Sequence, residues 1–146
     1  MSRFVGVAPT LVVPDIDATA GWFERVLGFT TEHAIRDHGP GDDAIPDGPD
    51  HVHTGPATFA IIGRDGLRLM LTRASDGLAR VNGAADGSLH DVYFWVTGIQ
   101  AIYEAARAHS RAIDPPEDRF YGVREVTLRT PDGHLIALGE LLRQPA

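Results

Sequence analysis

The stretch APTLVVPDIDATAGWFERVLGF (residues 8–29) decides the fold, because its hydrophobic pattern changes once, from that of a strand to that of a helix. The segment Ala8–Val13 is apolar and β-branched, and it predicts a strand. Beyond it, apolar residues recur every three or four positions, which predicts an amphipathic helix. Asp15 or Asp17 can cap the start of this helix, and Gly28 is well placed to end it.

The next part of the chain predicts three further strands and one long loop. Strands are expected over Phe29–Arg36, Ala57–Gly63 and Leu67–Arg73, and Arg64-Asp65-Gly66 predicts a hairpin turn between the last two. The segment Asp37–Pro56 is dense in Gly, Pro and Asp and predicts a loop. Its acidic residues either rim a groove and attract a cation or are simply solvated.

The same order of elements begins again near residue 90. A strand is expected over His90–Val96, and Thr97-Gly98-Ile99-Gln100 fits a capping box at the start of a second helix. Further strands are expected around Arg111–Asp114 and over Val123–Arg129 and Leu135–Leu141. This internal repeat predicts an α+β fold of two tandem βαβββ modules, whose curved mixed sheets surround a cleft.

The length of 146 residues suits a single domain made of these two modules. We expect module one at about 5–74, a linker at about 75–87 and module two at about 88–143. The absence of cysteine excludes disulfides and thiolate chemistry, and the absence of lysine excludes Schiff-base chemistry. A net charge of −7 without an arginine cluster argues against nucleic acid as a partner. No apolar run is long enough to cross a membrane, so we expect a cytoplasmic protein.

Two stretches of the chain resemble a known superfamily. The C-terminal segment PPEDRFYGVREVTLRTPDGHLIALGE (residues 115–140) and the helix segment DIDATAGWFERVLGF (residues 15–29) are similar to the vicinal-oxygen-chelate superfamily. This superfamily includes glyoxalase I, extradiol dioxygenases, fosfomycin-modifying enzymes and bleomycin-resistance proteins. The resemblance covers nearly the whole chain and implies the tandem βαβββ fold. It does not by itself imply one function, because this scaffold supports unrelated chemistries.

The resemblance also identifies four positions at which enzymes of the superfamily bind a divalent metal. Here these positions are Ala8, Met70, Asp91 (or His90 if the register slips by one residue) and Ala137. Three of the four have apolar side chains, and a catalytic metal normally needs about three protein ligands. The resemblance therefore favours the metal-free branch typified by bleomycin-resistance proteins, with no cofactor; if there is any metal ligand, it is His90.

Strand alternation adds candidate ligand-binding residues. In His90–Val96, Tyr93 and Trp95 are expected on the face that does not pack against the helix. Tyr121 is expected in a loop over the mouth of the groove. Arg124 and Glu125 suit an ion pair, a dimer contact or a ligand contact equally. The predicted ligand-binding residues are Tyr93, Trp95, Tyr121, Arg124, Met70 and Asp91.

Histidines offer an alternative set of metal ligands. His51 and His53 could present two imidazoles as a metal clip within the long loop. His38 is expected to be solvated and His134 to lie in a turn after Asp132-Gly133. An off-pattern metal site would draw on His90, His51, His53, Glu125 and Glu140.

Three functions remain open from the sequence. The favoured function is metal-independent binding or sequestration of a small aromatic or cationic molecule, similar to antibiotic resistance by sequestration, and without catalysis. The alternative is a metal-dependent lyase, isomerase or dioxygenase of the glyoxalase or dioxygenase type. A third is an interaction module without a small ligand. In each case open sheet faces and edges predict a homodimer, with modules paired within one chain or exchanged between chains.

Overall fold

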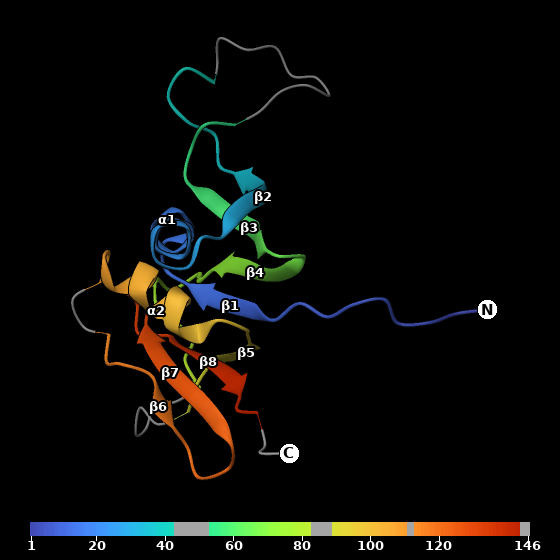
Figure 1. Cartoon of the computed structure of the whole chain (residues 1–146). Helices are drawn as coiled ribbons and strands as arrows, with labels where there is room; N and C mark the ends of the chain where they lie inside the picture. Colours follow the sequence, from blue (N-terminus) through green and yellow to red (C-terminus); the bar gives the residue numbers. More distant parts are fainter. Residues whose placement is uncertain (43–52, 83–88, 111–112, 144–146) are drawn as a thin grey trace.

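The structure is a computed structural model that describes residues 1–42, 53–82, 89–110 and 113–143 (Figure 1). Four strands and one helix form the first module. Its sheet has the order β1-β4-β3-β2, with β1 parallel to β4 and the other pairs antiparallel. The elements are β1 (Thr10–Val13), α1 (Ile16–Leu27), β2 (Thr30–Arg36), β3 (Ala57–Arg64) and β4 (Leu67–Arg73).

The second module repeats this plan, with the sheet order β5-β8-β7-β6 and β5 parallel to β8. The predicted α+β fold of two βαβββ modules is thereby confirmed, although the two sheets do not close into one barrel (Figure 1). The elements are β5 (Val92–Trp95), α2 (Ile99–Arg107), β6 (Glu117–Asp118), β7 (Val123–Arg129) and β8 (Leu135–Leu141).

Several predicted strand ends differ from the observed ones. The short strand expected around Arg111–Asp114 is found instead at Glu117–Asp118, and residues 111–112 lie outside the described residues. Pro115 and Pro116 have no N–H to donate to a neighbouring strand, so pairing with β7 begins only after them. The predicted hairpin between β3 and β4 is present, and both Asp65 and Gly66 have positive φ (52° and 80°), as a type I′ turn requires.

The two helices begin in different ways. The Asp15 carboxylate accepts a hydrogen bond from the Ala18 N–H (3.0 Å) and caps α1, as predicted. For α2 the predicted capping box is wrong, because Gly98 is the N-cap, in a left-handed conformation, and no side-chain hydrogen bond comes from the cap itself. The Glu140 carboxylate on β8 accepts the Gly98 and Ile99 N–H groups instead (2.6 and 3.2 Å). Glu140, which is 41 positions from Ile99 in the sequence, therefore accepts hydrogen bonds from the backbone N–H groups at the start of α2.

One hydrophobic core joins both modules. Helices α1 and α2 pack against each other (Figure 1). Buried side chains of both sheets belong to the same cluster. The Phe29 ring contacts Phe23 of the first module and Phe94 of the second, with centroids 5.3 and 5.7 Å apart. Trp22 is 6% exposed and belongs to this core. The opposite face of each sheet, away from its helix, is called the open face below.

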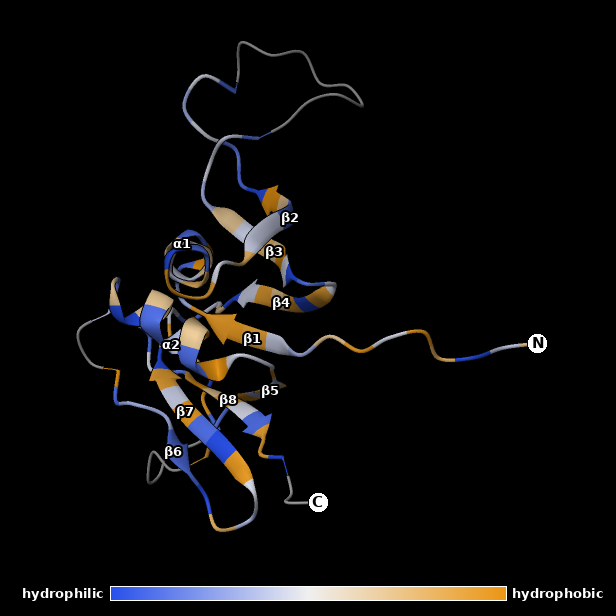
Figure 2. Ribbon diagram, viewed as in Figure 1, coloured by the Kyte–Doolittle hydropathy of each residue, from blue (hydrophilic) through white to orange (hydrophobic). Residues whose placement is uncertain are grey.

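Apolar and polar residues are interspersed along the strands, as Figure 2 shows for β7. This pattern is typical of sheets with one buried and one open face. Among the described residues, no helix has both the length and the apolar character needed to cross a membrane.

Candidate functional site

The open face of the second module is built around Tyr93. Its neighbours in β5, Val92 and Phe94, belong to the core, so alternation directs Tyr93 and Trp95 to the opposite face. A Cβ atom at position 139 would overlap the Tyr93 hydroxyl. Glycine at this position therefore allows the Tyr93 ring to cross β8 and reach β7.

Glu125 of β7 is the polar centre of this face. Its Oε2 accepts a hydrogen bond from the Tyr93 hydroxyl (2.6 Å), and its Oε1 accepts from the Tyr121 hydroxyl and from Arg119 Nε (3.2 Å). Burial alone would raise the pKa of Glu125, but the hydrogen bonds from Tyr121, Tyr93 and Arg119 outweigh it and lower the pKa. Glu125 is therefore a charged acceptor at neutral pH. Burial and the hydrogen bond to Glu125 raise the pKa of Tyr93, so its hydroxyl stays protonated.

Aromatic rings extend from this carboxylate across the face. The Tyr93 ring lies 4.9 Å from Trp95 and 5.3 Å from His90, measured between centroids. Trp95 is 59% exposed and Tyr121 is 53% exposed, and the fully exposed Phe120 contacts Tyr121 edge-on. Exposed rings beside a carboxylate can stack on a flat molecule and attract a positive charge. We call His90, Tyr93, Trp95, Tyr121 and Glu125 the aromatic platform.

The structure does not bring all six predicted ligand-binding residues together. Because side chains alternate along β7, Arg124 lies on the same face as the buried Val126, and Glu125 lies on the opposite face. The Arg124 guanidinium pairs with Asp118 of β6 (2.6 and 3.2 Å). Met70 lies in the first sheet, where it pairs with Ile61 of β3. Tyr93, Trp95 and Tyr121 do come together, and Glu125 joins them. The buried Val126 and Leu128 are the sequence signal that would have placed Glu125, and not Arg124, on this face.

Asp91 serves a structural role. Its Oδ1 accepts the Asn82 N–H (2.7 Å) and its Oδ2 accepts the Leu135 N–H (2.9 Å). Both carboxylate oxygens are therefore used to fasten the segment before β5 to its neighbours. His90 is exposed, and its ring rests against Tyr93.

A cavity of about 690 Å³ lies at the junction of the two modules rather than between their open faces. This volume is typical of small-molecule sites. Trp95 lines it, and none of the other five predicted ligand-binding residues does. Trp95 thus borders both the cavity and the aromatic platform. Residues from both modules line it, among them Phe29, Arg64, Leu67, Ile102 and Glu140.

His134 lies in the turn after Asp132-Gly133, as predicted, and its side chain is completely buried. Its Nδ1 lies 3.0 Å from Asp132 Oδ2, and its Nε2 lies 2.8 Å from the Arg80 carbonyl oxygen. Burial alone would lower the pKa of His134, but the hydrogen bond and charge of Asp132 raise it overall. Both partners are acceptors, so the ring is best satisfied as an imidazolium. This histidine anchors the segment around Arg80 to the turn before β8.

The sequence as a whole fits one family model. The model of the glyoxalase/bleomycin resistance protein/dioxygenase superfamily matches residues 5–138. The chain belongs to this superfamily. Its βαβββ repeat, derived above from the spacing of apolar residues, is the superfamily's own architecture.

Several solved structures share the fold. A glyoxalase-related enzyme from Clostridium phytofermentans has a TM-score of 0.71 at 16% identity, over 97% of this chain and 98% of that one. The bleomycin-binding protein of Streptomyces verticillus, complexed with copper(II)-bleomycin, has 0.58 at 20% identity, over 99% and 100%. TnmS3, an antibiotic-binding protein from Streptomyces sp. CB03234, has 0.61 at 16% identity, over 97% and 99%. No curated protein matches the sequence.

The residues at the superfamily's metal positions do not fit a metal. In the first sheet Thr10 pairs with Met70, and in the second sheet Tyr93 pairs with Ala137. Ala8 lies two residues before Thr10, and Asp91 lies two residues before Tyr93. Ala8 and Asp91 therefore occupy equivalent positions in the two modules. Alanine and methionine supply no oxygen or nitrogen ligand, and the Asp91 carboxylate is held by two backbone N–H groups. Of these four positions, only Asp91 therefore has a side chain with an oxygen ligand, and both of its oxygens already accept hydrogen bonds.

The described residues do not form the alternative metal site either, which was predicted from His90, His51, His53, Glu125 and Glu140. Glu125 pairs with Gly139 across the sheet and Glu140 pairs with Arg124, so the two carboxylates lie on opposite faces of the second sheet. His51 lies outside the described residues. Within residues 1–42, 53–82, 89–110 and 113–143, one group of three potential ligands lies close together, formed by His38, Asp42 and His53 of the first module.

Proposed function

We propose that this protein binds a small, planar aromatic or cationic molecule on the aromatic platform, reversibly and without a metal. The observation that carries the proposal is the contact of Tyr93 with both Trp95 and the Glu125 carboxylate. Trp95 and Tyr121 offer exposed ring faces for stacking, and the ionised Glu125 offers negative charge for a cation. No step in this function requires bond formation or cleavage.

Two of the solved structures that share the fold support a binding function. One of them binds copper(II)-bleomycin, and another is described as an antibiotic-binding protein. Sequestration of a drug needs only a Kd below the drug concentration, and about 1 μM corresponds to about −8 kcal/mol. Two or three ring contacts at about 0.5–1.5 kcal/mol each, together with burial of apolar surface, are of the right size.

We also infer that the binding site is completed in a homodimer. Trp95, Phe120 and Tyr121 remain strongly exposed in a single chain, and so do Phe4 and Val7 of the N-terminal segment, which extends away from the body (Figure 1). Large exposed apolar side chains in such numbers suit an interface between two chains. Sedimentation at micromolar concentration is expected to give one species near twice the 15.8 kDa chain mass. A species at the mass of one chain would contradict this inference.

A fluorescence titration tests the binding proposal. Of the two tryptophans, Trp22 is buried and Trp95 exposed, so a ligand on the platform should quench chiefly the Trp95 emission. Metal-free bleomycin is the first probe, added to protein treated with EDTA. We expect saturable quenching that is unchanged by EDTA and absent in Trp95→Phe. Binding that appears only after addition of a divalent metal, or quenching that persists in Trp95→Phe, would contradict the proposal.

A further inference from the structure

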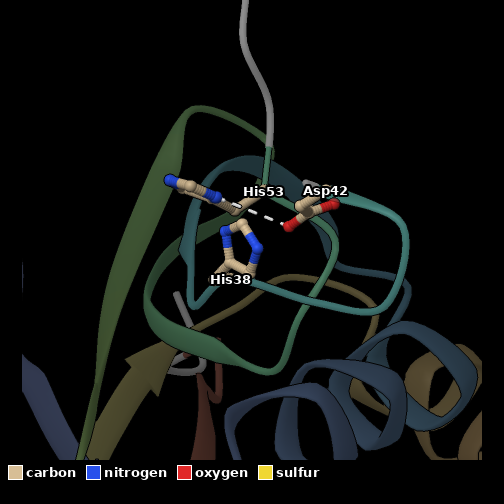
Figure 3. Close-up of side chains that lie close together, drawn as sticks. All are labelled: His38, Asp42 and His53. Atoms are coloured by element: carbon tan, nitrogen blue, oxygen red, sulfur yellow. Dashed lines mark ion pairs between the residues drawn. The ribbon is translucent and has the colours of Figure 1, made fainter. Parts of the chain in front are cut away.

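The neck of the long loop gathers three side chains that metals bind. His38 and Asp42 follow β2, and His53 precedes β3, so the three residues come from the two sides of the neck (Figure 3). Their potential ligand atoms all lie within 4.8 Å of one another. The Nδ1 of His53 lies 3.4 Å from Asp42 Oδ2, and the His38 and His53 ring centroids are 5.4 Å apart.

The backbone of the neck is fixed by its own hydrogen bonds. The Asp37 N–H donates to the Pro56 carbonyl (2.9 Å), and the Gly55 N–H donates to the Asp37 carbonyl (2.8 Å). The two sides approach so closely that a Cβ at Gly39 or Gly55 would collide with the opposite side. Both residues must therefore be glycine for the neck to close.

Side chains then fasten the neck to the rest of the first module. Asp17 of α1 pairs with Arg36 (2.9 Å) and accepts the Ala57 N–H (3.0 Å). Arg73 of β4 donates to the Asp37 carboxylate (2.8 Å). The segments that carry the three side chains are thus attached to both a helix and a strand, and such support holds ligands in place.

Asp42 is the most constrained member of the group. It is 1% exposed, and its Oδ2 accepts the Gly39 and Thr54 N–H groups (2.6 and 3.0 Å) while its Oδ1 accepts the Thr54 hydroxyl (2.7 Å). The hydrogen bonds from Thr54 and Gly39 lower the pKa of Asp42. Its Oδ1 keeps one further lone pair, since a carboxylate oxygen can accept two hydrogen bonds.

We propose that His38, Asp42 and His53 form a binding site for a divalent transition metal. Two imidazoles and one carboxylate are a ligand set used by Zn²⁺ and related ions, whereas Mg²⁺ and Ca²⁺ prefer oxygen ligands throughout. Bonds of about 2.0–2.1 Å place neighbouring ligand atoms about 3–3.5 Å apart, so the ligand atoms, which now lie within 4.8 Å of one another, must move closer when the ion binds. His38 is exposed and His53 is partly exposed, so an ion can reach both rings from solvent and water can fill its remaining positions.

The hydrogen bonds to Asp42 also suit this proposal. Carboxylates that bind metals are themselves usually held by outer hydrogen bonds, and here two backbone N–H groups and a hydroxyl supply them. The competing interpretation is that Asp42 serves only to tie the neck, with His53 as a local charge partner. The site lies in the first module, apart from the superfamily's metal positions and from the aromatic platform, so it does not affect metal-independent ligand binding.

Titration with metal alone distinguishes the two interpretations. Protein without a histidine tag is treated with EDTA, dialysed and titrated with Zn²⁺ by calorimetry and with Co²⁺ by visible absorption. We expect one ion per chain, and at least tenfold weaker binding in both His38→Ala and His53→Ala. His33→Ala and His109→Ala, which alter exposed histidines elsewhere, are matched controls and should bind as the unaltered protein does.

Three outcomes would overturn the proposal. They are the absence of stoichiometric binding, binding that neither His38→Ala nor His53→Ala weakens, and binding that His51→Ala or His90→Ala abolishes while His38→Ala leaves it intact. The circular dichroism spectrum of each variant shows whether it is folded. Bleomycin quenching of the metal-free protein is measured in parallel, so failure of the metal site and failure of the ligand site can be told apart.

Discussion

Replacement of Trp95 by alanine is expected to weaken ligand binding strongly while affecting stability little. Trp95 is 59% exposed and packs on Tyr93 with ring centroids 4.9 Å apart. A fully buried aromatic residue costs about 3–5 kcal/mol when truncated to alanine. Because Trp95 buries less than half of its side chain, the ring contact with Tyr93 should dominate, at about 0.5–1.5 kcal/mol.

The effect on binding should be larger than the effect on folding. Loss of one stacked ring and its buried area is expected to cost about 1.5–2 kcal/mol of binding free energy, or about 10- to 30-fold in Kd. The assay is calorimetric titration of bleomycin, with urea unfolding of the same variant. Ile35→Ala, which truncates a similarly exposed apolar side chain in the first module, is the matched control and should bind normally.

Two further variants locate the ligand. Tyr121→Ala removes a ring of the aromatic platform only, and Leu67→Ala alters the junction cavity only. We expect Tyr121→Ala to weaken binding and Leu67→Ala to leave it unchanged. If Leu67→Ala and Trp95→Ala weaken binding while Tyr121→Ala does not, the ligand occupies the cavity and the reasoning is refuted. If Trp95→Ala lowers the free energy of unfolding by about 3 kcal/mol or more, Trp95 is buried in the core and not exposed.

Three other variants test the remaining contacts. Glu125→Gln should destabilise the protein by about 1–2 kcal/mol and weaken a cationic probe more than a neutral one, as urea unfolding and paired titrations would show. Glu140→Gln should cost about 1 kcal/mol through the first turn of α2. His134→Gln should cost about 2–3 kcal/mol below about pH 6.5, because the raised pKa of His134 favours the folded imidazolium there. That difference should shrink as pH rises through the raised pKa, which unfolding curves between pH 5 and 9 would measure.

Much of the fold could be predicted because it depends on patterns within short segments. The change of spacing after Val13, the Asp15 cap and the Asp65-Gly66 turn are local, and each is found as expected. Alternation within β5 predicts that Tyr93 and Trp95 share one face, and their ring centroids lie 4.9 Å apart. Because the same order of helices and strands occurs twice, the two-module architecture could also be predicted.

The contacts that could not be predicted join residues far apart in the sequence. The carboxylate that caps α2 comes from Glu140, and the carbonyl that holds His134 comes from Arg80, 54 residues earlier. The predicted capping box was wrong because a tertiary contact replaced it, whereas His134 does lie in the predicted turn and only its burial depends on distant residues. His38 and Asp42 likewise become neighbours of His53 only when the neck of the long loop closes.

Metal-independent ligand binding is tested most directly by a thermal unfolding screen of the EDTA-treated protein against bleomycin and a panel of planar aromatic cations. A ligand at 100 times its Kd should add about 2.7 kcal/mol of stability, which corresponds to about 5–10 °C for a chain of this length. We predict that at least one compound raises the Tm of the unaltered protein by this amount without added metal, and that Trp95→Ala loses most of the shift. If no compound raises the Tm without metal, or if the shift is the same in Trp95→Ala, the account is contradicted.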